Sequence, residues 1–116
     1  MEKIFYIDQE EVVRKAFELS AKGLNMWLYG QETLEYADSL IRELDPDVII
    51  ASVDTLRTSD ELAHAVFSAI SERSRMLIYL EGKSPILSHW PEAPSIKRPF
   101  NPLDVLRNLP NYLNLH

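Results

Sequence analysis

The stretch Pro46-Asp47-Val48-Ile49-Ile50-Ala51-Ser52-Val53-Asp54 decides the fold of this chain. Residues 48–51 are all apolar and lack the alternation of polar and apolar positions that marks a strand with one face in water. An unbroken run of this kind is typical of a central parallel strand that helices cover on both faces. Ligands of open parallel sheets bind just beyond the carboxyl ends of the strands. Ser52 and Asp54 stand at that end, and they are therefore the first candidate site residues.

Apolar periodicity on both sides of this strand predicts an alternation of strands and helices. Helix boundaries are indicated by Pro46, by a capping box at Thr58 and Glu61, and by Asn101 followed by Pro102. The expected elements are strand 3–7, helix 9–22, strand 24–29, helix 31–44, strand 48–52, a helix from 58, strand 76–80, strand 95–97 and a helix from 102. Strict alternation implies a parallel sheet with right-handed crossovers.

Segment 81–94 interrupts this alternation. It holds Gly82 and the prolines Pro85, Pro91 and Pro94. Because proline removes a backbone donor and clashes with the preceding helical turn, at most a turn or two of helix can form there. The sequence therefore predicts a shortened or missing helix between the last two strands.

Length and composition limit the classes of protein to which the chain can belong. Its 116 residues predict one domain over residues 1–116, and an apolar share of 46% is ordinary for a globular protein. The absence of cysteine excludes disulfides and thiolate metal sites and agrees with a reducing compartment. No apolar run approaches the roughly 20 residues that span a bilayer, and Asp8 comes too early for a signal peptide. We therefore expect a cytoplasmic protein.

The charge and the glycine content narrow the possible partners. A formal net charge of −6 argues against binding to nucleic acid and to an anionic membrane surface. The three glycines form no Gly-rich phosphate loop, so a small-molecule or cofactor binder is disfavoured. We expect a protein partner, no nucleic acid, no membrane and no cofactor, and a homodimer is a further possibility.

Four short motifs follow one another along nearly the whole chain. They are Ile7-Asp8-Gln9-Glu10, the stretch from Pro46 to Ile50, Ile78-Tyr79-Leu80, and Lys97-Arg98-Pro99-Phe100-Asn101-Pro102. Together, in this order, they resemble the receiver domain of bacterial response regulators. The resemblance implies an α/β fold of the flavodoxin-like, doubly wound kind, with a five-stranded parallel sheet in the order 2-1-3-4-5. In this chain the fourth helix of that fold would be the shortened or missing one.

The same resemblance predicts a site from which the family's chemistry has been lost. It implies a phosphoryl-accepting aspartate six residues after the motif's proline, where this chain has Ser52. A serine hydroxyl is far from ionised at neutral pH, and no base is placed to activate it. The family's acidic pair is reduced to Asp8 and Gln9, although Mg²⁺ needs several oxygen ligands. The degenerate phospho-acceptor pocket is thus expected to contain Asp8, Gln9, Ser52, Asp54, Glu81 and Lys97.

These departures predict a pseudo-receiver, which is a phosphorylation-independent module for protein–protein interaction in bacterial signalling. It would not be an enzyme, and it would have no catalytic residues and no metal. The alternative is an atypical active receiver that is phosphorylated on Asp54. Which cation faces the pocket, Lys97 or Arg98, stays open.

The candidate interaction surface consists of His89, Trp90 and Arg98. Trp90 is the leading contact residue because tryptophan is enriched at the centres of interfaces. The alternative is that Trp90 covers core left bare by the shortened helix. His64 has no metal-ligating pair at helical spacing after it, and Asp60 before it is explained by helix capping, so a metal role for His64 is disfavoured.

Overall fold

The computed structural model describes residues 2–113 of the chain. Its elements are β1 (Lys3–Ile7), α1 (Glu11–Gly23), β2 (Trp27–Gln31), α2 (Ala37–Leu44), β3 (Val48–Ser52), α3 (Val53–Leu56), α4 (Asp60–Ser71), β4 (Met76–Leu80), β5 (Ser95–Ile96), α5 (Pro102–Arg107) and α6 (Leu109–Leu113). Among these helices, none has the length and apolar character needed to cross a bilayer.

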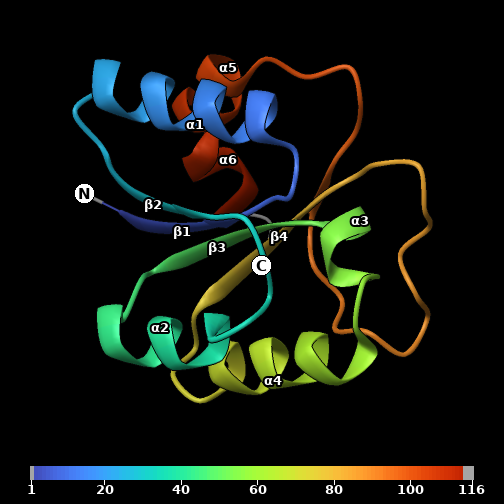
Figure 1. Cartoon of the computed structure of the whole chain (residues 1–116). Helices are drawn as coiled ribbons and strands as arrows, with labels where there is room; N and C mark the ends of the chain where they lie inside the picture. The colour runs from blue at the N-terminus through green and yellow to red at the C-terminus, as the bar shows by residue number, and fades with distance from the viewer. Residues whose placement is uncertain (1, 114–116) are drawn as a thin grey trace.

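The five strands form one sheet in the order β2-β1-β3-β4-β5, and every neighbouring pair is parallel. Figure 1 shows α1, α5 and α6 on one face of this sheet and α2 and α4 on the other. The predicted flavodoxin-like topology is therefore confirmed. Segment 81–94 contains no helix, so the crossover between β4 and β5 is an irregular loop, as its prolines predicted.

The central strand β3 is buried along its whole length, because side chains of both faces enter a core. Val48 and Ile50 pack with Ile4, Tyr6 and the side chains of α1 and α5. Ile49 and Ala51 pack on the other face against the side chains of α2 and α4. The unbroken apolar run thus has the cause that was predicted for it, which is a helical layer on each side of the sheet.

Several predicted boundaries are wrong by a few residues. The cap of α4 is Ser59, whose hydroxyl accepts a hydrogen bond from the Leu62 amide, whereas the Thr58 hydroxyl donates to the Thr55 carbonyl. Strand β2 continues to Gln31, and α2 begins only at Ala37. After Ser52 the chain turns directly into the short helix α3 instead of staying extended.

Trp90 is a core residue, and its prediction as a surface contact is corrected here. Its side chain is only 5% exposed and packs against the rings of Phe67 and Tyr79, with centroids 5.6 and 6.0 Å away. The missing crossover helix would otherwise cover this part of the sheet. A bulky aromatic side chain from the irregular loop takes over that role, in agreement with the alternative interpretation.

Candidate functional site

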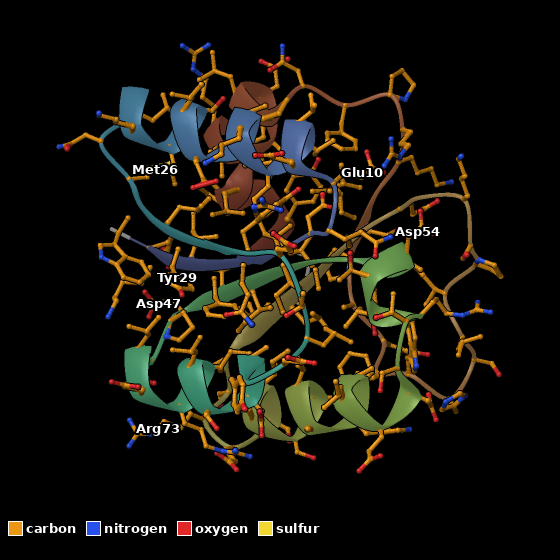
Figure 2. All side chains as sticks on the ribbon, in the orientation of Figure 1. Glu10, Met26, Tyr29, Asp47, Asp54 and Arg73 are labelled. Atoms are coloured by element: carbon orange, nitrogen blue, oxygen red, sulfur yellow. The ribbon has the colours of Figure 1, made fainter. Side chains whose placement is uncertain are left out.

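Most of the residues predicted to form the pocket lie at the carboxyl edge of the sheet, where β1, β3 and β4 end. Figure 2 shows Glu10 and Asp54 at this edge, and Asp47 at the opposite edge where β3 begins. Asp8, Gln9, Ser52, Asp54 and Glu81 follow directly after these strands or end them. Parallel strands place their carboxyl ends together, and this placement was the part of the site that the sequence could specify.

Asp8 is buried, with 1% of its surface exposed, and both of its carboxylate oxygens accept hydrogen bonds. The Tyr6 hydroxyl donates to Oδ2 at 2.7 Å, and the Glu10 amide donates to Oδ1 at 2.9 Å. Burial raises the pKa of Asp8 above its usual value, although these two donors act in the opposite direction. Burial and the neighbouring carboxylate also raise the pKa of Tyr6, so its phenol remains protonated and donating.

Ser52 is a helix cap. Its hydroxyl oxygen accepts a hydrogen bond from the Thr55 amide at 3.4 Å, which begins α3, and the residue is only 6% exposed. The Thr55 hydroxyl in turn accepts a hydrogen bond from the Gln9 amide at 2.9 Å, while the Gln9 residue is largely exposed. The position of the family's phosphoryl acceptor is therefore occupied by a side chain with a local structural role.

Asp54 lies in the first turn of α3 and anchors the loop after β4. Its Oδ1 accepts the Ser84 amide at 2.8 Å, and its Oδ2 accepts the Lys83 amide at 3.0 Å. Burial alone would raise the pKa of Asp54, but these two amides, together with the Ser84 side chain and the charge of Arg98, outweigh it and hold the pKa below its usual value. Gly82 makes this approach possible, because a Cβ on it would lie 2.1 Å from Asp54 Oδ2.

Arg98, not Lys97, is the cation that closes the edge of the pocket. Its Nε donates to the Glu81 carbonyl at 3.1 Å, and its guanidinium pairs with the Glu10 carboxylate at 3.0 Å. The Glu81 side chain accepts a hydrogen bond from the Ser95 hydroxyl at 2.7 Å, which ties β4 to β5. Lys97 is exposed to solvent.

These contacts do not fit a magnesium site. Each carboxylate oxygen of Asp8 and Asp54 already accepts a hydrogen bond from an N–H or O–H donor, so a cation could reach only the remaining lone pair of each oxygen. Mg²⁺ demands octahedral oxygen ligands at short distances. Over residues 2–113, the one group of three side chains placed to ligate a metal is Asp60, His64 and His89, which lies outside this pocket.

Sequence reasoning missed the residue that donates a hydrogen bond to the buried pocket carboxylate. Tyr6 lies two positions before Asp8, and the period of a strand places side chains two residues apart on the same face. A tyrosine on the same face as the pocket aspartate, two residues before it, was therefore the available signal. This signal is weak, because a tyrosine in a buried strand is also an ordinary core residue.

We expect Tyr6→Phe to destabilise the fold by about 1–2 kcal/mol at neutral pH, because Asp8 loses the donor to one buried oxygen. The folded-state pKa of Asp8 then rises further. A carboxyl whose pKa is higher in the folded than in the unfolded chain adds stability at low pH. This stability is fully present below the pKa of the unfolded chain and is lost as the pH rises through the pKa of the folded chain. The cost should therefore grow from acidic to neutral pH in denaturant titrations.

The control for Tyr6→Phe is Tyr79→Phe. The Tyr79 hydroxyl also donates a hydrogen bond, but this contact is only partly buried and its acceptor is the uncharged Pro91 carbonyl, at 2.6 Å. Its cost should not change over the same pH range. Equal pH dependence of the two variants would contradict the assigned Tyr6–Asp8 contact.

Comparison with solved structures finds proteins with the same fold. No family model matches the sequence, and no curated protein was found to match it. The chemotaxis response regulator CheY4 of Vibrio cholerae is 18% identical, with a TM-score of 0.75 over 97% of this chain and 98% of that chain. The signal receiver domain of an HD domain-containing protein from Pseudomonas fluorescens Pf-5 is 16% identical, with a TM-score of 0.75 over 98% and 95% of the two chains.

A third structure has a similar fold. The pseudo-receiver domain of the CikA protein is 13% identical, with a TM-score of 0.68 over 97% of this chain and 98% of that domain. Identities this low show a common fold and do not assign a function. The chain therefore has the fold of the response-regulator receiver domains.

Proposed function

We propose that this chain is a pseudo-receiver, a signalling domain that binds a protein partner without being phosphorylated. The observation that carries the proposal is the pairing of every carboxylate oxygen of Asp8 and Asp54 with a donor of the chain itself. Receiver chemistry needs a free carboxylate nucleophile beside a bound Mg²⁺. Because Ser52 stands at the position of that nucleophile, the chain has the receiver fold without the carboxylate that receiver chemistry needs.

The alternative, an active receiver phosphorylated on Asp54, requires a rearrangement. The Asp54 carboxylate would have to release the Lys83 and Ser84 amides, which hold the loop after β4. It would also need a cation near Asp8, whose oxygens face Tyr6 and the Glu10 amide. These requirements favour the pseudo-receiver.

Of the three predicted interaction residues, Trp90 is buried, and Arg98 and His89 are exposed. The surface that we assign to a protein partner lies beside Arg98. An open groove of about 570 Å³ runs between the start of α1 and the segment before α5, and Arg98 borders it. Its other lining residues are mostly apolar: Val12, Val13, Ala16, Pro99, Phe100 and Pro102. Val12 is 83% exposed, and such apolar exposure at a groove with a charged rim is common in protein interfaces.

The proposal is tested by treating the chain with Mg²⁺ and acetyl phosphate. We expect no gain of a phosphoryl group in the intact mass, and we expect the same cytoplasmic protein to be captured with and without the treatment. Val12→Asp should abolish capture, whereas Tyr36→Asp, at a similarly exposed site just before α2, should leave it unchanged. A phosphoryl group on Asp54, or capture only after treatment, would establish the active alternative. Self-capture alone would identify a homodimer.

A further inference from the structure

Asp60, His64 and His89 lie together on the surface, away from the pocket at the strand ends. The metal-ligating atoms of the three side chains all lie within 4.8 Å of one another. Two of them come from α4 and one from the irregular loop 81–94. We propose that they form a binding site for a borderline divalent cation of the zinc class, with one oxygen and two imidazole ligands.

The geometry is close to that of a tetrahedral zinc site. Zinc bonds of about 2.0–2.1 Å place neighbouring ligand atoms about 3.3–3.4 Å apart. His64 Nε2 lies 3.5 Å from Asp60 Oδ2, and His89 Nε2 lies 3.4 Å from Asp60 Oδ1. Both imidazoles therefore turn the same ring nitrogen toward one carboxylate, and small rotations of three exposed side chains bring the ligands around one ion. The fourth position is open to water, as in sites with three protein ligands.

Two independent features hold the ligands in place. Asp60 and His64 are four residues apart on α4, so the helix itself puts them on one face. His89 is held through its neighbour Trp90, which is buried and whose amide closes a turn onto the Leu87 carbonyl. The guanidinium of Arg57 fixes the same loop by donating to the Pro85 carbonyl at 2.9 Å.

The donor set selects the kind of cation. Imidazole nitrogen suits zinc and its transition-metal neighbours, whereas Mg²⁺ and Ca²⁺ prefer sites built from oxygen alone. The net charge of −6 favours the approach of any cation. A bound ion would join α4 to the loop that replaces the crossover helix, so it would fix the conformation of that loop. This inference is independent of the proposed pseudo-receiver function.

The test is a calorimetric titration of the chelator-treated full chain with ZnCl₂ in the presence of excess MgCl₂. We expect saturable binding of one zinc ion per chain and a rise in Tm on binding. His64→Ala and His89→Ala should each weaken zinc binding at least tenfold and abolish the rise in Tm. Both positions are more than half exposed, so the variants should fold, which circular dichroism checks. His116→Ala, at the third histidine of the chain, is the matched control and should bind as the unchanged protein does.

Three results would overturn the proposal. The first is the absence of saturable zinc binding, which would leave the cluster as two ordinary pairs between histidine and aspartate. The second is zinc binding that His116→Ala abolishes and the other two variants do not. The third is binding of one ion per two chains with formation of a dimer, which would place the ion between copies.

Discussion

Trp90→Ala is expected to lower the free energy of unfolding by about 3–5 kcal/mol, which is the usual cost of truncating a buried aromatic side chain. Trp90 is 5% exposed and packs against Phe67 and Tyr79. Removing the indole leaves a cavity under loop 81–94, which has no helix of its own to close it. Equilibrium denaturation by urea, followed by far-UV circular dichroism, measures the change.

The matched control is Trp27→Ala on the edge strand β2. Trp27 is 38% exposed, and its ring lies 4.8 Å from the Lys3 ammonium nitrogen. We expect its loss to cost about 1 kcal/mol, as for a partly exposed cation–π contact. A cost for Trp90→Ala no larger than that of Trp27→Ala would mean that Trp90 is not part of the core. Trp90→Ala also cannot serve as a probe of partner binding, because unfolding alone would reduce capture of the partner.

Gly82→Ala is expected to have the second-largest effect, a loss of about 2–3 kcal/mol. The new Cβ would lie 2.1 Å from Asp54 Oδ2, so the carboxylate must move away. It then loses the Lys83 and Ser84 amides, and hydrogen bonds to a charged group contribute more than neutral ones do. Because the fold lowers the pKa of Asp54, the stability from these contacts is present above the unfolded value and is lost as the pH falls through the folded value. The difference from the unchanged protein should therefore shrink at acidic pH.

Gly23→Ala is the control for this change. Gly23 ends α1, and a Cβ there meets no atom within 4 Å. Alanine should be neutral or stabilise by up to about 1 kcal/mol through its helix propensity.

Asp54→Ala should cost as much as Gly82→Ala, and the double variant should add little to either. Additive losses in the double variant would show that Gly82 acts on stability by another route than Asp54.

The fold could be predicted because it depends on patterns that local sequence carries. The unbroken apolar run of β3, the helical spacing on both sides and the prolines of segment 81–94 each follow from the period and backbone rules of a single element. The central position of β3 and the absence of the crossover helix were therefore predictable. The cap of α4 was missed by one residue, because Thr58 and Ser59 are both competent caps.

The site could be predicted only as a location. Which residues stand at the carboxyl ends of the strands follows from the order of elements, but their contacts come from other parts of the chain. Asp54 binds amides 29 and 30 residues away, and Arg98 reaches Glu10 across 88 residues. Such partners depend on how the loops pack, and no spacing rule gives them. The burial of Trp90 was open for the same reason, since tryptophan suits a core and an interface equally well.

The most direct test of the pseudo-receiver account is a titration of the folded chain with Mg²⁺ and beryllofluoride, followed through the backbone amide signals in two-dimensional NMR. If the oxygens of Asp8 and Asp54 remain paired with Tyr6 and the loop amides, the signals of residues 8, 52, 54, 83 and 84 should not change. Saturable, Mg²⁺-dependent shifts confined to these residues would show a working phosphoryl site and would contradict the account.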